Sequence, residues 1–251
     1  MTTSDRHRTQ ITFLILLLSA ITWVMLLVSP LGVTLNHCPV SDSDRSLASF
    51  QMLLQMNPIS SLVIGWTVML IAMMLPTLIQ PIHHVRERSF KRRRLRSVVL
   101  FVAGYAVIWM LAGALLLTTI MVLNWVLPGS YLPPIIVGTI ALVWQCSPTK
   151  QRCLNRSHNH RALKAFGVAA DLDALRFGIA HGVWCVGSCW ALMLLPMVIT
   201  EGHLAAMAAV SFLMISERLE RPMPLAWRLS LRGKLLRILI AQTRIRLHAL
   251  L

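Results

Sequence analysis

The sequence predicts an all-α membrane protein, a polytopic bundle of about six transmembrane helices. Its composition is the first reason: 56% of the residues are hydrophobic, 13% are charged and the mean hydropathy is +0.67. Soluble globular domains have roughly 45–50% apolar and about 25% charged residues. The grouping of apolar residues into long segments is the second reason, and the distribution of basic residues between them is the third. This composition excludes a soluble enzyme, a disulfide-rich secreted domain and a disordered chain.

Six apolar segments follow one another along the chain. A helix needs about 20 apolar residues to cross a hydrocarbon core of roughly 30 Å, and the first five segments meet this length. The sixth is shorter and ends at Ser216-Glu217-Arg218, so its assignment depends on its neighbours. The first is too long for a signal-peptide core and lacks a small-residue cleavage site, so we expect an uncleaved anchor. The segments are residues 11–34, 60–80, 98–123, 126–146, 177–199 and 204–219.

The basic residues define the orientation. The chain has 24 Lys and Arg against nine Asp and Glu, and six spans place all of the 24 except Arg45 on one face. The positive-inside rule makes that face cytoplasmic, with both termini inside. We therefore expect a multi-pass protein of the bacterial inner membrane whose basic charge meets anionic lipid headgroups and not nucleic acid. The predicted parts are a cytoplasmic N-terminus (1–10), a membrane domain (11–222) and a basic tail (223–251).

The basic tail predicts an amphipathic helix. Residues 225–248 read LAWRLSLRGKLLRILIAQTRIRLH, in which Arg recurs among Leu and Ile. Such a helix lies on the inner leaflet with its apolar side in the lipid. Docking onto a partner subunit is the alternative use of the same residues.

The fifth segment carries a series of soft metal ligands. Side chains four residues apart share one face of a helix, and at 1.5 Å per residue the series covers about 24 Å of a span. Thiolate and thioether sulfur suit Cu(I), and imidazole also suits copper, zinc and nickel. The series consists of His181, Cys185, Cys189, Met193 and Met197.

The second segment offers a counterpart in WTVMLIAMMLP, where Met69 and Met73 are four residues apart and Met74 follows. Packing is the alternative for all of these residues. Methionine fills irregular apolar gaps, and free cysteine behaves as a small buried hydrophobe.

Two further features lie at the inner end of the bundle. Cys146 and Cys153 flank a basic segment, but the seven residues from one to the other do not match a zinc-finger spacing, and an ordinary solvated loop explains them as well. Glu217 lies near the end of the sixth segment. An acidic group in a membrane span is a functional candidate, although pairing with Arg218 or a neighbouring loop also accounts for it.

Several motifs together resemble a known family. WTVMLIAMMLP (66–76), GYAVIW (104–109), PTKQRCL (148–154), GIAHGVWCVGSCWALMLL (178–195) and SERLERP (216–222) occur in this order. Over residues 60–222 the chain resembles the metal-binding integral membrane proteins catalogued as domain of unknown function 2182. The resemblance implies a role for Met73, Met74, Pro76, Lys150, Cys153, Cys185, Gly187, Cys189, Trp190, Met193 and Glu217.

The chain departs from that family at three places. The family commonly has adjacent cysteines where this chain has Ser188-Cys189, and a further cysteine where it has Arg156-Ser157-His158. The family's acidic-lysine pair is Glu217-Arg218 here. Fewer thiols imply a weaker site, a different metal or a structural paralogue.

Three functions are compatible with these patterns. The first is a membrane protein that binds and moves or delivers a soft metal, with Cu(I) favoured over zinc and nickel and with a metal chaperone or membrane subunits as partners. The second is an accessory or structural subunit of a larger membrane complex that holds no metal of its own. The third is redox chemistry at Cys185 and Cys189, but no catalytic constellation accompanies these thiols and we expect no enzyme.

Overall fold

The computed structural model describes residues 3–28, 55, 58–127, 132–159, 163–164, 166–199, 201–227 and 240–241. All regular structure within these residues is helical, which confirms the predicted all-α class. The predicted amphipathic tail lies outside the described residues, apart from 223–227 and 240–241. The elements are α1 (Thr3–Val28), α3 (Ile59–Met74), the 3₁₀-helix η1 (Leu75–Leu78), α4 (Ile79–Arg88), α5 (Arg94–Val126), α6 (Leu132–Cys146), α7 (Pro148–Ser157), α8 (Gly167–Val198) and α9 (His203–Leu219).

Four helical stretches of the described chain are long and apolar enough to cross a membrane. The α6–α7 pair, bent by 65°, adds a fifth if it forms one span. Helix α9 has 17 residues, about 26 Å at 1.5 Å per residue, so the sixth span stays a prediction. Large apolar side chains on the outer surfaces, such as Leu115 of α5, are exposed as a lipid-facing surface requires. The four stretches are Arg6–Val28, Ile59–Arg88, Arg94–Val126 and Gly167–Val198.

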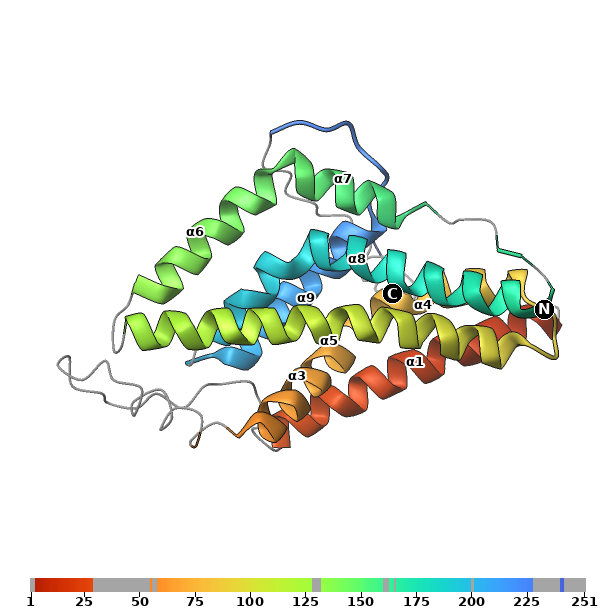
Figure 1. Cartoon of the computed structure of the whole chain (residues 1–251), viewed down its shortest axis with the longest axis horizontal. Coiled ribbons are helices and arrows are strands. Elements are labelled where there is room, and N and C mark those ends of the chain that lie inside the picture. Colours follow the sequence, from red (N-terminus) through yellow and green to blue (C-terminus); the bar gives the residue numbers. More distant parts are fainter. Residues whose placement is uncertain are drawn as a thin grey trace, which may run out of the picture.

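Helices α5 and α8 form the centre of the molecule and run side by side along its long axis (Figure 1). Helix α1 packs against α3, η1 and α4, while α6, α7 and α9 pack against α8. The starts of α1, α5 and α8 lie at the same end of the molecule (Figure 1). At that end, Asp171 of α8 pairs with Arg96 of α5 at 2.7 Å and with Arg93 at 3.6 Å.

A proline determines how α1 attaches to α3. Pro76 has no N–H, so the carbonyl of Ala72, four residues earlier, loses its helical partner. Ser19 and Trp23 of α1 donate hydrogen bonds to this carbonyl at 2.8 and 3.1 Å. A carbonyl without a partner is costly within a bilayer, so these two bonds explain why α1 lies against the point where α3 passes into η1.

Candidate metal centre

Helix α8 buries the whole series of soft ligands. His181, Cys185, Cys189, Met193 and Met197 are each at most 5% exposed. Cys189 lies nine residues before the end of α8 at Val198, about 14 Å along the helix axis. The thiols therefore lie deep within the bundle, well away from the end of the helix.

Two cysteines form the centre of this site, and both are free thiols. Cys185 and Cys189 are buried one helical turn apart on the same face of α8. The Sγ of Cys185 lies 3.3 Å from the Tyr105 hydroxyl, and that of Cys189 lies 3.3 Å from Ser188 Oγ. Because Ser188 Oγ also donates to the carbonyl of Cys185 at 2.8 Å, the serine fixes the geometry between the two cysteines.

Two more hydrogen-bond donors face the thiol pair. The indole N–H of Trp109, one turn after Tyr105 on α5, is buried and has no hydrogen-bond partner in the described part of the chain. Arg218, in the last turn of α9, donates to Ser188 Oγ at 3.5 Å and interacts with both thiols. Polar groups of α5 and α9 thus lie around the sulfur atoms that α8 supplies.

Close packing of α5 and α8 brings Tyr105 to Cys185. A Cβ atom at Gly178 would lie 2.1 Å from the carbonyl oxygen of Phe101, and one at Gly104 would lie 2.6 Å from that of Leu175. Only glycine permits such an approach of two backbones. Tyr105 follows Gly104 directly and therefore reaches the thiol from the closest part of the α5–α8 interface.

Methionine sulfur is abundant in the same core. Met69, Met73 and Met74 of α3 are at most 2% exposed and belong to the apolar core that contains the thiol pair. On the same helix, Trp66 donates to the carbonyl of Trp109 at 3.1 Å. Met69 and Met73 follow Trp66 by three and seven residues, so this methionine-bearing face of α3 is turned toward α5.

Cys153 does not join the thiol pair. Its Sγ lies against Gly187, where an added Cβ would be 2.7 Å from the sulfur. Gly187 is two residues from both Cys185 and Cys189, so it points to the opposite side of α8. His158, from the same inner cluster, has its ring nitrogens 2.8 and 3.0 Å from the carbonyls of Leu154 and Arg218.

Glu217 belongs to a buried polar network that joins α7 to α9. Its Oε1 accepts a hydrogen bond from Lys150 Nζ at 2.5 Å and another from Gln145 Nε2. Lys150 Nζ also donates to Gln145 Oε1 at 2.5 Å. Lys150 and Glu217 are both at most 3% exposed, and a buried charge needs such a partner. This pairing, and not one with Arg218, is the one the structure forms.

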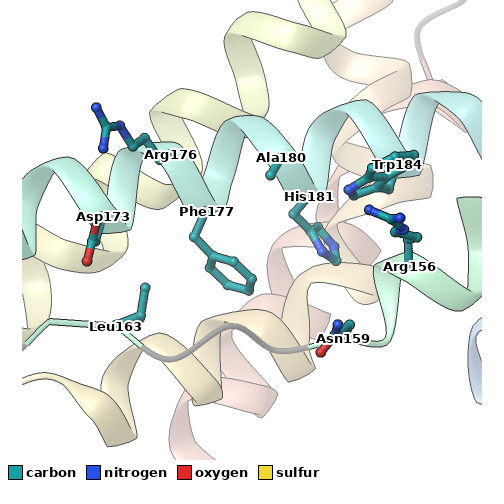
Figure 2. A pocket seen from close by; sticks show the side chains of 9 residues that line it. All are labelled: Arg156, Asn159, Leu163, Asp173, Arg176, Phe177, Ala180, His181 and Trp184. Atoms are coloured by element: carbon teal, nitrogen blue, oxygen red, sulfur yellow. The ribbon is translucent and has the colours of Figure 1, made fainter.

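A cavity of about 230 Å³ lies beside the first half of α8 and reaches His181, one turn before Cys185. Figure 2 shows His181 pointing into the space between Phe177 and Trp184. Its ring also lies 6.0 Å from that of Tyr105, which contacts the Cys185 thiol. His181 therefore lies between the cavity and the thiol pair. The cavity is lined by Arg156, Asn159, Leu163, Asp173, Arg176, Phe177, Ala180, His181 and Trp184.

The side chains of this site indicate which metals it suits. The described part of the chain has no group of three His, Cys, Asp or Glu side chains that could hold a metal. Two thiols on adjacent turns of one helix, with thioethers in the same core, are soft ligands of the kind that bind copper.

The sequence alone did not identify several residues around the thiol pair: Tyr105, Trp109, Ser188 and Arg218. A signal was present for the first two. The GYAVIW motif places Tyr105 and Trp109 four residues apart, on one face of a helix. Only the packing of α5 against α8 shows that this face meets the thiols.

The fold and the site define an all-α protein with membrane-spanning helices and a buried dithiol in a methionine-rich core. Residues 63–233 match the family model of the copper chaperone PpoB2. The chain therefore belongs to this family of copper chaperones, which confirms the resemblance to metal-binding membrane proteins. Comparison with curated proteins and with solved structures found no match.

Proposed function

We propose that this protein carries Cu(I) within the bacterial inner membrane, bound by the thiolates of Cys185 and Cys189, and delivers it to a copper-dependent partner. The observation that carries the proposal is the pair of adjacent buried thiols faced by Tyr105, Trp109 and Arg218. Membership of a copper chaperone family supports copper as the cargo.

The surroundings of the thiol pair support movement of the ion. Met193 and Met197 continue one and two turns beyond Cys189, and thioethers bind Cu(I) while leaving it exchangeable with stronger thiolate ligands. On the other side, His181 lies between Cys185 and the cavity. In this proposal the ion enters through the cavity, contacts His181, and rests on the two thiolates.

The remaining predicted ligands have different parts in this proposal. Met69, Met73 and Met74 supply a thioether lining on α3. Cys153 and Glu217 hold α7 in place, because the first packs against Gly187 and the second pairs with Lys150. We therefore propose that neither of these two residues binds copper.

Copper stoichiometry of the detergent-purified protein tests the proposal. The protein is loaded with Cu(I) under reducing conditions, desalted and analysed for bound copper. We expect the wild type to retain copper, whereas Cys185→Ser and Cys189→Ser lose most of it, since a hydroxyl is a poor Cu(I) ligand of nearly the same volume. Cys146→Ser removes a thiol outside the pair and is the matched control.

A second arm separates ligands from packing. Met193→Leu conserves volume and costs less than about 1.5 kcal/mol of stability, so a weaker affinity for Cu(I) in this variant indicates a thioether ligand. Equal copper in the wild type, both single variants and the Cys146→Ser control would refute the proposal. The structural subunit of a larger complex would then be the better assignment.

A further inference from the structure

Arg218 supplies a positive charge at the thiol pair that no carboxylate neutralises in the described part of the chain. None of the ion pairs formed by the described residues includes Arg218. The nearest acid in sequence, Glu217, is already paired with Lys150 at 2.5 Å, so that pair adds no net charge. The guanidinium of Arg156 lies over the ring of Trp184, which puts it on the cavity side of α8.

The formal charge of the occupied site then depends on the charge of the ion. Two coordinating cysteines lose their protons and contribute two negative charges. A monovalent ion leaves one negative charge, and Arg218 cancels it. A divalent ion cancels both thiolates by itself, and the charge of Arg218 then remains uncompensated among Trp109, Tyr105 and Ser188, each of which is at most 4% exposed. Arg218 itself is half-buried, and a net charge beside such buried groups is costly, so the monovalent ion is the better occupant.

We propose that Arg218 is a specificity-determining residue that selects monovalent over divalent ions at Cys185 and Cys189. This inference rests on the proposed function, because it requires that the two thiols bind metal. A positively charged side chain repels a metal cation, so its place beside the thiol pair needs a reason. The charge of Arg218 is matched to the net negative charge of the complex that the two thiolates form with Cu(I).

Competition between Ag(I), a monovalent probe, and Cd(II), a divalent one, tests the inference on the full-length protein in detergent. We expect Arg218→Gln to lower the affinity ratio of Ag(I) to Cd(II) at least tenfold. Arg218→Lys keeps the charge and is expected to keep most of the preference. An equal change of the ratio in the Gln and Lys variants, or no change in either, would overturn the inference.

A second variant tests the same charge without removing the arginine. Ser188 Oγ is 3.5 Å from the guanidinium of Arg218, so Ser188→Asp places a carboxylate beside it and neutralises it. The Ag(I) to Cd(II) ratio is expected to fall as in Arg218→Gln, and to fall further in Ser188→Asp than in the neutral, nearly isosteric Ser188→Asn. An unchanged ratio in Ser188→Asp, in protein that still binds Ag(I), also counts against the inference.

The same measurements distinguish the inference from the proposed function. If Ag(I) binding is unaffected by Cys185→Ser and Cys189→Ser, the thiol pair is not the metal site and both proposals fail. If Ag(I) binding depends on both cysteines but the Ag(I) to Cd(II) ratio is independent of charge at position 218, only the inference on Arg218 fails.

Discussion

The sulfur atom of Cys185 is placed among hydrogen-bond donors and is otherwise surrounded by apolar groups. Tyr105 approaches at 3.3 Å, and the thiol of Cys189 and the indole of Trp109 complete its surroundings. In a medium of low polarity a charged sulfur depends on such donors, since water does not solvate it. The donors therefore stabilise the thiolate that coordinates the metal more than the thiol of the empty site.

The Tyr105 hydroxyl provides the test of this role at the scale of a residue. Tyr105→Phe removes one donor and leaves the ring in place between Trp109 and His181. A hydrogen bond to a charged group is worth about 1.5–3 kcal/mol, so we expect Cu(I) affinity to fall by about tenfold or more. Competition with a Cu(I) chelator measures the affinity, and thermal unfolding of the empty protein shows whether the fold is preserved. Unchanged affinity would show that the hydroxyl does not stabilise the occupied site.

The sequence predicts the residues that α8 contributes to this site but not those that α5 and α9 contribute. Cys185, Cys189 and Met193 lie on one helix at intervals of four, so helical geometry alone groups them. Tyr105 and Arg218 are 80 and 33 residues away from Cys185 along the chain. Their approach depends on which helices pair and at what rotation, and hydropathy carries no information on either. For Glu217 the sequence offered Arg218 or a neighbouring loop as the partner, and only the packing identifies it as Lys150 of α7, within the segment expected to be a loop.

At the scale of elements, α7 is a helix where the sequence suggested a loop, and local signals at its start account for it. The sequence suggested a solvated loop after Cys146, but α7 runs from Pro148 to Ser157. Ser147 caps it, with its Oγ accepting hydrogen bonds from the backbone N–H groups of Thr149 and Lys150 at 3.1 and 3.2 Å. A serine N-cap followed by proline at the first helical position is a recognised helix start. The polar composition of the segment obscured this signal.

The contact of α5 with α8 depends on glycine, and a pair of matched substitutions tests this dependence. Gly178→Ala puts a Cβ 2.1 Å from the backbone carbonyl of Phe101, where relief requires the helices to separate. Overpacking typically costs about 1–3 kcal/mol, so we expect a lower melting temperature, by roughly 2–10 °C for a chain of this size, together with weaker Cu(I) binding.

The control for this prediction is Gly138→Ala on α6. An added Cβ at Gly138 meets nothing within 4 Å, and alanine is the better helix former by up to about 1 kcal/mol. This variant should melt at or slightly above the wild-type temperature and bind Cu(I) normally. If both variants melt alike, the glycine contact does not hold α5 against α8.

At the scale of the whole molecule, the fold brings the basic starts of α1 and α5 and the basic end of α4 to one end (Figure 1). Asp171 of α8 pairs with Arg96 at the start of α5, and Glu87 at the end of α4 lies 3.8 Å from Arg8 near the start of α1. The starts of α1, α5 and α8 accordingly lie together (Figure 1). The long-range contacts and the charge pattern of the sequence thus agree on which ends of the helices share a membrane face.

This agreement leads to a topology that fusions can test. Six spans would place 23 of the 24 Lys and Arg on one face, and the positive-inside rule then predicts that this face is cytoplasmic. Reporters fused at residues 92, 160 and 235 should therefore read as cytoplasmic, and reporters at residues 45 and 129 as extracytoplasmic. The pair at 160 and 235 is the most informative, because the chain between them contains α8 and the short helix α9. The same side for both requires α9 to return across the membrane after α8. Opposite signals at 160 and 235, with 92 and 160 on the same side, would mean that α9 does not span. Arg218 and the thiol pair would then have to meet without a sixth crossing.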